Sequence, residues 1–169
     1  MIELPKVLKN MNLFVDGKGY AGRVDEIQLP KLTLKTEEHR AGGMDVPVEI
    51  DLGMEKLEAE LTISDYDPDL FRLFGLLDAA ATPITLRGAI QAQGQQAKPV
   101  TVHLRGGFKA LEPSAWKPGE KSTIKAMVAA SYYKLAIDGQ ELIEIDAINL
   151  VRKVGGVDQM ARIRQAIGV

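Results

Sequence analysis

The sequence runs Leu29-Pro30-Lys31-Leu32-Thr33, then Glu37-Glu38-His39-Arg40-Ala41-Gly42-Gly43-Met44, and then Asp51-Leu52-Gly53. A strand-like run of alternating polar and apolar residues stops at the Arg-x-Gly-Gly-Met turn, and a second such run begins after it. Paired glycines at a strand tip permit positive φ angles and close backbone approach. The stretch therefore predicts a β-hairpin whose tip presses against another surface; a plain mobile loop is the alternative.

Alternation continues through the rest of the chain. Leu57, Ala59, Leu61 and Ile63 alternate with polar residues, which is typical of a half-buried strand with one polar face. The runs around the hairpin, at 31–37 and 46–52, have the same period and predict half-buried strands too. Asp16-Gly17 and Asp138-Gly139 are typical of tight hairpin turns, and Gly106-Gly107 predicts a bulge or bend in a strand.

Two short helices are expected. Asp67 is a good N-cap and Pro68 a good first residue for the earlier helix. Its apolar stripe would consist of Leu70, Phe71, Leu73, Phe74 and Leu77. A second helix, capped by Asp158, is expected to run to residue 167. Together these elements predict one mainly β domain over residues 1–169.

Composition excludes several classes of function. The 169 residues are 46% hydrophobic but only 5% aromatic, so the core must be mostly aliphatic. With no cysteine and two histidines, the chain cannot form a disulfide or a histidine-based metal cluster. Its net charge of −2 supplies neither a basic field for nucleic acid nor a polybasic segment for a membrane. The start Met1-Ile2-Glu3-Leu4-Pro5 lacks a signal-peptide pattern, so we expect folding in a cytoplasm.

Residues that resemble catalytic or phosphate-binding groups have simpler explanations. Glu144 and Asp146 point to one side of a strand, but no nucleophile pattern accompanies them. His39 lies in a charged segment near a turn, and His103 belongs to a polar strand face. Gly155-Gly156 lacks the lysine and the further glycines of a phosphate loop. We therefore predict no enzymatic activity, no metal site and no cofactor.

Two blocks of sequence carry a resemblance to a known family. The first joins residues 8–17, Leu-Lys-Asn-Met-Asn-Leu-Phe-Val-Asp-Gly, to the hairpin stretch quoted above. The second is Ser131-Tyr132-Tyr133-Lys134-Leu135, Asp138-Gly139, Glu144-Ile145-Asp146, Asn149 and Val154-Gly155-Gly156-Val157-Asp158. With these blocks the chain resembles the major tail tube proteins of contractile-tailed phages, a family that includes the inner tubes of R-type phage-tail-like bacteriocins. Residues 65–122 match loosely.

The resemblance implies an antiparallel β-sandwich or partly open barrel, whose strands join a ring-shaped inner β-barrel in a homohexamer. Hexameric rings would stack head to tail inside a contractile sheath. Strand physics agrees with this, because a closed ring leaves no open strand edge. Four strands from each copy would give a barrel of about 24 strands and roughly 50 Å backbone diameter, wide enough for a DNA duplex.

The resemblance also implies partners and sites. Partners would be other copies, the tail sheath protein, and baseplate and tail terminator proteins. DNA would pass without specific binding and no membrane would be involved. The protein would belong to the virion and assemble in the host bacterial cytoplasm. We expect Arg40, Gly42, Gly43 and Met44 to contact a neighbouring subunit or ring, and the acidic strand face of Glu58, Glu60 and Thr62 to line the lumen. An outer, sheath-facing or solvated surface is the alternative for that face.

Three other functions remain open from the sequence. The tube could belong to a bacteriocin-like or secretion-type contractile injection device. A monomeric β-sandwich that binds carbohydrate or a small ligand would require an aromatic-lined cleft. An enzyme would require a catalytic constellation, and we find none in the sequence.

Overall fold

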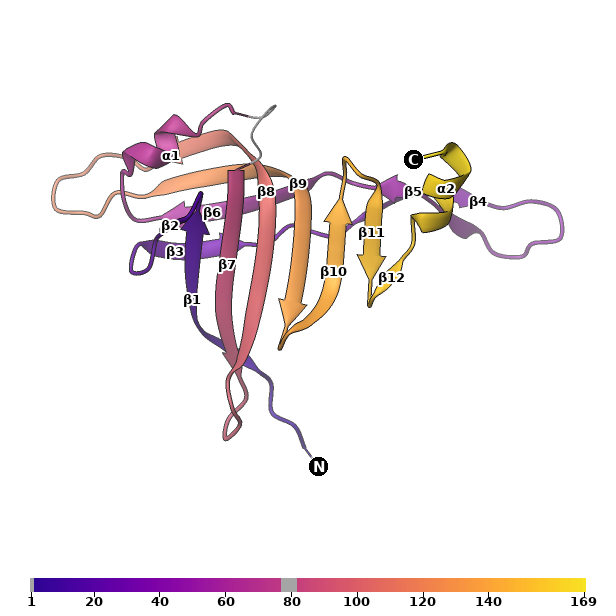
Figure 1. The fold of residues 1–169 in the computed structure, drawn as a ribbon, viewed down its shortest axis with the longest axis horizontal. Helices are drawn as coiled ribbons and strands as arrows, with labels where there is room; N and C mark the ends of the chain where they lie inside the picture. Colours follow the sequence, from indigo (N-terminus) through magenta and orange to yellow (C-terminus); the bar gives the residue numbers. More distant parts are fainter. Residues whose placement is uncertain (1, 77–81) are drawn as a thin grey trace.

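The computed structural model describes residues 2–76 and 82–169, which form twelve strands and two short helices (Figure 1). The strands are β1 Val7–Val15, β2 Lys18–Gly19, β3 Val24–Gln28, β4 Leu34–His39, β5 Val48–Met54, β6 Leu57–Ile63, β7 Thr82–Gln91, β8 Lys98–Pro113, β9 Ile124–Ile137, β10 Gln140–Asp146, β11 Val151–Val154 and β12 Val157–Asp158. The helices are α1 Pro68–Arg72 and α2 Ala161–Ile167. The predicted mainly β fold with two short helices is confirmed.

The strands form two antiparallel layers that share β8 and β9. The broad layer has the order β12-β11-β10-β9-β8-β7-β1-β2 and uses residues 98–106 of β8 and 132–137 of β9. The narrow layer has the order β3-β6-β9-β8 and uses residues 124–130 of β9 and 106–113 of β8. In Figure 1 the strands of the broad layer run vertically and those of the narrow layer cross behind them. The described residues thus form an open sandwich and not a closed barrel.

Gly106 allows β8 to bend from one layer into the other. The pairing of β8 with β9 shifts register between Arg105 and Gly106. A Cβ atom at position 106 would overlap the carbonyl oxygen of Ala129 and would lie 2.8 Å from its carbonyl carbon. Only glycine leaves room for the crossing backbone. The predicted bend at Gly106-Gly107 is therefore confirmed, and its cause is close approach of two backbones.

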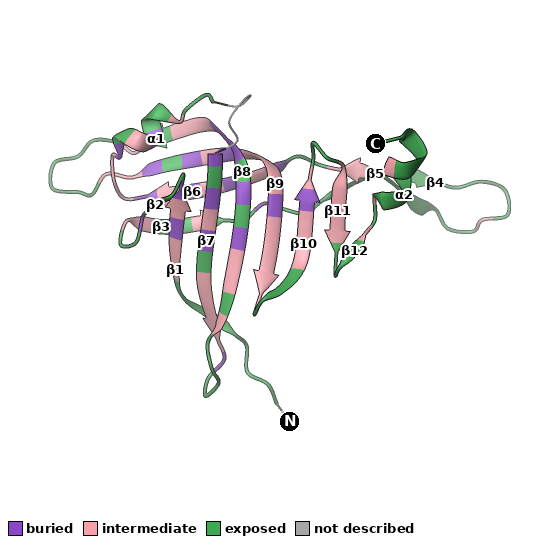
Figure 2. Cartoon of the chain, viewed as in Figure 1, coloured by how far each residue is buried: buried purple, intermediate pink, exposed green. Residues whose placement is uncertain are grey.

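The core lies between the two layers. Leu57, Ala59, Leu61 and Ile63 of β6 are all buried, as their alternation predicts (Figure 2). They belong to one cluster with buried residues of the broad layer: Leu13, Val15, Ile84, Leu86, Val102, Leu104 and Tyr133. The core is largely aliphatic, in agreement with the composition.

The hairpin of β4 and β5 projects from the sandwich as a separate two-stranded sheet (Figure 1). The prediction that the strands of this hairpin are half-buried was wrong. The exposed fractions of Val46, Val48, Ile50 and Leu52 lie between 45 and 68%. The alternation is present, but the described part of the chain does not bury its apolar side (Figure 2).

Helix α1 begins where the sequence predicts. The Asp67 carboxylate accepts a 3.0 Å hydrogen bond from the Asp69 backbone N–H, which caps the first turn. Of the predicted apolar stripe, Leu70 is buried, whereas Phe71 and Phe74 are exposed. Leu77 lies outside the described residues.

Helix α2 begins later than predicted, at Ala161, with Met160 as its N-cap. Asp158 belongs to β12 and stabilises the helix differently: it accepts a 3.0 Å hydrogen bond from the Met160 N–H and pairs with Arg164 at 2.5 Å. No residue within α2 is buried. Neither helix of the described residues is long and apolar enough to cross a membrane.

Candidate functional site

The hairpin tip is a closed turn that projects into solvent. The Met44 N–H donates to the Ala41 carbonyl at 3.2 Å, and Arg40 Nε donates to the Met44 carbonyl at 3.2 Å. Gly43 has a φ of 88°, which favours glycine, whereas Gly42 has no such requirement. The structure therefore brings Arg40, Gly42, Gly43 and Met44 together, with open space around both glycines.

One side of the hairpin is apolar along β5. Val48, Ile50 and Leu52 share this side with Glu37 and His39 of β4, which are the cross-strand neighbours of Ile50 and Val48. At the base of the hairpin, Arg152 of β11 donates a 2.7 Å hydrogen bond to the Asp51 carboxylate. This bond, together with the N–H of Gly53, lowers the pKa of Asp51. Arg152 thus ties the base of the hairpin to the sandwich.

Glu58, Glu60 and Thr62 lie together on the outward face of β6, opposite the core. Glu60 pairs with Lys125 at 3.2 Å, and Glu58 pairs with Lys56 at 3.0 Å and also with Lys109. The bond from Lys109, followed by that from Lys56, lowers the pKa of the Glu58 carboxyl. The face is therefore an organised array of charges.

The register between neighbouring strands shows that this face continues across the whole narrow layer. Glu26 of β3, Thr62, Lys125 of β9 and Glu112 of β8 form one cross-strand row. The face carries four acidic and three basic side chains, namely Glu26, Glu58, Glu60, Glu112, Lys56, Lys109 and Lys125. Sequence reasoning named only Glu58 and Glu60 among these charged residues, because most of the others reach the shared face through pairing between distant strands.

The narrow layer has two open edges among the described residues. β3 pairs with β6 alone, and residues 109–113 of β8 pair with β9 alone. Next to this second edge, the Gly75 N–H donates to the Phe108 carbonyl at 3.0 Å. Unpaired edges are templates for strands of another chain.

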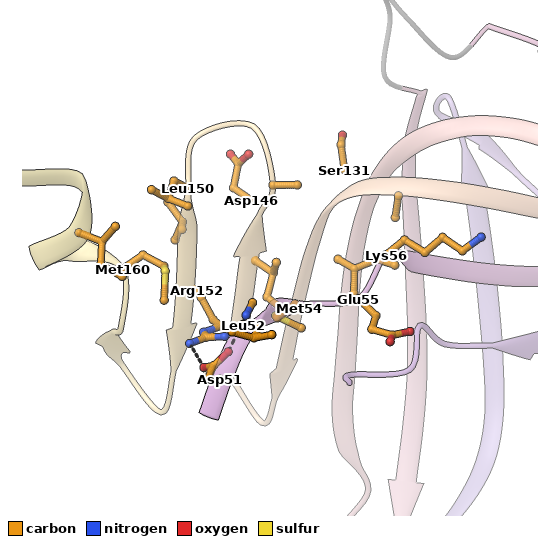
Figure 3. A pocket seen from close by; sticks show the side chains of 17 residues that line it. Asp51, Leu52, Met54, Glu55, Lys56, Ser131, Asp146, Leu150, Arg152 and Met160 are labelled. Carbon is orange, nitrogen blue, oxygen red and sulfur yellow. Dashed lines mark hydrogen bonds and ion pairs between the residues drawn. The ribbon is translucent and has the colours of Figure 1, made fainter. Parts of the chain in front are cut away.

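A pocket of about 820 Å³ lies between the base of β5, strands β10 and β11, and α2 (Figure 3). Its walls are mainly apolar, and Figure 3 shows the Asp51–Arg152 pair at one side. A second pocket beside β6 measures about 370 Å³. No aromatic side chain lines either pocket. The pockets therefore lack the aromatic lining expected of a carbohydrate-binding module.

The pair Glu144 and Asp146 has a structural role. Asp146 accepts hydrogen bonds of 3.1 Å from the backbone N–H groups of Ile148 and Asn149. Burial raises its pKa, but these bonds and the amide of Asn149 outweigh burial and lower it overall. Tyr132 donates to Glu144 at 3.3 Å. Within residues 2–76 and 82–169, no group of three or more His, Cys, Asp or Glu side chains is arranged to hold a metal ion.

An open-edged sandwich with a projecting apolar hairpin is a shape suited to assembly, and comparison with known proteins identifies the family. The family model for phage tail tube protein FII matches residues 5–168. The chain belongs to this family. The tail tube protein of Escherichia phage P2 is 35% identical, covering 98% of this chain and 99% of that protein. The major tail tube protein of Serratia phage KSP20 is 31% identical, covering 98% of each.

Solved structures share the fold at low sequence identity. The sheath/tube terminator of the extracellular contractile injection system PVC superposes with a TM-score of 0.61 at 11% identity, covering 80% of this chain and 99% of that one. A chain of the PVC sheath-tube complex gives 0.59 at 11% identity, covering 78% and 91%. The tube terminating cap of the anti-feeding prophage gives 0.58 at 10% identity, covering 81% and 93%.

Membership in the phage tail tube family settles the class of function. Tail tube proteins are structural components of the virion. The prediction that the chain is not an enzyme is thereby confirmed. The resemblance noted in the sequence is confirmed by the family model and by both phage relatives.

Proposed function

We propose that this chain, as one domain over residues 1–169, is the major subunit of the inner tail tube of a contractile phage tail. Its copies form hexameric rings that stack into a channel for DNA. The observation that carries the proposal is the narrow layer: four strands, open at both edges, with a charged outward face and an apolar inward one. A strand layer of this kind is complete when its edges pair with those of neighbouring copies.

Ring closure would join the edge of β3 in one copy to residues 109–113 of β8 in the next. Each copy then adds four strands to one continuous sheet, giving about 24 strands in a hexamer. The closed sheet has no unpaired edge, which removes the aggregation risk that each subunit carries alone.

The outward face of the narrow layer would line the lumen. Its four glutamates outnumber its three lysines, so the lining has an acidic surplus and repels DNA phosphates without binding them. The outward face of the broad layer is balanced, with four basic and four acidic residues: Arg87, Arg105, Lys134, Lys153, Glu141, Glu144, Asp146 and Asp158. The acidic surplus thus favours the narrow layer as the lumen side.

The remaining surfaces suit the other expected partners. The tip residues Arg40, Gly42, Gly43 and Met44 would contact a neighbouring subunit or the next ring. The outer surface would meet the sheath, and the ends of the tube would meet baseplate and terminator proteins. No cofactor or membrane takes part, and assembly takes place in the host bacterial cytoplasm. Because the relatives at 35% and 31% identity are phage proteins, a phage tail is favoured over a bacteriocin-like or secretion-type device.

Size-exclusion chromatography and negative-stain microscopy of the purified protein test the proposal. Hexameric rings or tubes with an open lumen are expected as concentration rises. A monodisperse monomer at high concentration, unchanged by addition of preformed tube ends, would contradict it and favour a monomeric binding module.

A further inference from the structure

An exposed aromatic cluster lies at the loop that joins β8 to β9. Trp116 is 82% exposed, yet its indole N–H donates a 2.7 Å hydrogen bond to the Tyr66 hydroxyl. The ring centroid of Tyr66 lies 6.3 Å from that of Trp116 and 6.2 Å from that of Phe71 in α1. We call these three residues, Trp116, Tyr66 and Phe71, the aromatic cluster.

The cluster has the character of a contact surface. Tyr66 is half-buried and also donates to the Ser114 carbonyl at 3.4 Å, so hydrogen bonds hold the Tyr66 and Trp116 rings at the loop. Grouped, exposed aromatic side chains usually mark interaction sites, because their burial by a partner contributes strongly to binding.

Position in the molecule indicates which partner the cluster fits. The β8–β9 loop and the β4/β5 hairpin lie at opposite ends of the long axis of the molecule (Figure 1). When copies associate head to tail, one end of a copy meets the opposite end of the next, and the two surfaces must be complementary. An apolar feature at one end then requires an apolar acceptor at the other.

We propose that the aromatic cluster of one copy receives the β4/β5 hairpin of a copy in the next ring, an inference that rests on the proposed stacking of rings. The hairpin offers Val46, which is 68% exposed, and Val48 beside it. The described residues of their own subunit leave both side chains exposed. Packing them against the rings of Trp116 and Phe71 removes apolar surface from water on both copies.

Charge supports the same pairing. Residues 37–49 of the hairpin contain four acidic residues and one arginine, whereas residues 114–123 of the loop contain two lysines and one glutamate. Lys121 pairs with Asp25 of its own subunit at 2.9 Å. Lys117 is exposed at the loop, next to Trp116, and can face the acidic hairpin. Opposite charges around an apolar centre fix the register of two surfaces.

Chemical cross-linking tests the contact directly, because the chain has no cysteine of its own. The test variant combines Asp45→Cys with Ala115→Cys; both positions are exposed and flank Val46 and Trp116 without removing an apolar contact. A short bismaleimide should link tubes of this variant into ladders longer than one ring. The control combines Asp45→Cys with Gln95→Cys, an exposed position in the β7–β8 turn, and should yield no such ladder. Tubes of the test variant that show no ladder above this control would overturn the inference.

A second pair of variants covers the case in which the cysteine variant does not assemble. Trp116→Ala should leave the melting temperature and the rings intact and should raise the concentration needed for tubes about tenfold. Trp116→Phe, which keeps an aromatic ring, should lie between Trp116→Ala and the wild type. Normal tube growth with Trp116→Ala would overturn the inference, and if sheath attachment then fails, the occupant is the sheath. Failure of the wild type to form rings or tubes counts against the proposed function instead.

Discussion

Gly106 is the residue on which the two-layer arrangement depends most directly. The backbone of β9 crosses so close that a Cβ atom at position 106 would lie 2.8 Å from the Ala129 carbonyl carbon and 2.9 Å from the Ala130 Cα. Neither neighbour is a flexible side chain that can move aside. Gly106→Ala should therefore destabilise the subunit by about 3 kcal/mol or more, measured by urea unfolding of the monomer. Gly42→Ala, with open space and no positive φ, is the matched control and should be nearly neutral. Equal stability of the two variants would show that the bend does not need glycine.

The ionisation of Asp67 should affect how the stability of the subunit changes at acid pH. Its side chain is 2% exposed and pairs with Lys18 at 2.7 Å. Burial raises the pKa of this carboxyl, but the Lys18 bond, the Asp69 N–H and the Tyr20 hydroxyl outweigh burial and lower the pKa to about 2. A carboxyl with a depressed pKa stabilises the fold above its unfolded pKa and loses that contribution as pH falls through its folded pKa.

Stability of the wild type should therefore decline between about pH 4 and pH 2 as Asp67 takes up a proton. Asp67→Asn should cost about 2 kcal/mol at pH 7 and flatten this decline, as measured by urea unfolding at several pH values. Asp69→Asn is the control, since that carboxylate is 46% exposed, and its effect should be much smaller. If the acid response of Asp67→Asn matches the wild type, another group controls it.

At the scale of single elements, the sequence predicts those features that depend on residues close together in the chain. The cap at Asp67, the turn at Asp138-Gly139 and the alternation of β6 all follow from neighbouring residues, and the structure has all three. The predicted burial of the hairpin strands was wrong, because alternation shows that a strand has an apolar side but does not show what covers that side. The partners Lys109 and Lys125 of the β6 face depend on the register between strands far apart in sequence.

The hairpin tip is the element in which a contact role can be separated from folding. Gly43→Val and Met44→Asp should block tube growth and leave the monomer folded, because a Cβ atom at Gly43 would meet no described atom within 4 Å and Met44 lies outside the core. Valine at a φ of 88° costs about 1–2 kcal/mol, and so does Gly94→Val at a φ of 79° in the β7–β8 turn. Gly94→Val is therefore the control for strain and should still form tubes. Normal assembly of either tip variant in electron micrographs would show that the tip makes no essential contact.

For helix α2, a role in ring formation can be tested separately from its contribution to the stability of the subunit. It buries no residue in its own subunit and is attached mainly through Arg164, which donates to Asp158 at 2.5 Å and to the Leu150 carbonyl at 2.6 Å. A helix this short is not stable alone. Deleting residues 157–169 should lower the melting temperature by only about a few degrees, but should prevent ring formation. Intact rings and an unchanged melt after deletion would rule out a docking role for the helix.

At the scale of the whole molecule, the two layers divide the surface by charge. The narrow layer has an acidic surplus on its outward face, and the broad layer has balanced charges on its own. Because the same strands β8 and β9 pass through both layers, one bend at Gly106 fixes both faces relative to each other. Which face lines the channel therefore determines the electrostatic environment of passing DNA.

Replacing the acids of the narrow layer by lysine tests that assignment. Glu58→Lys with Glu60→Lys would place two new cations in each copy beside Lys56, Lys109 and Lys125. If this face lines the lumen, the clustered lysines retain DNA phosphates by counterion release, which weakens steeply as salt increases. The expected result is normal-looking particles that eject DNA more slowly than the wild type at low salt and recover speed at high salt.

The control makes the same change in charge on the broad layer, with Glu141→Lys and Glu144→Lys. These two acids share Lys134 as their ion-pair partner, at 2.7 Å and 4.0 Å, and so stand in a comparable charged setting. Because both double variants change the net charge equally, a difference in their ejection rates would come from the position of the charges and not from the total charge. Slow, salt-dependent ejection confined to the Glu58/Glu60 variant would place the narrow layer at the channel. The same defect in the Glu141/Glu144 variant alone would place the broad layer there. Wild-type ejection kinetics of the Glu58/Glu60 variant at every salt concentration would refute the assignment of the narrow layer to the lumen.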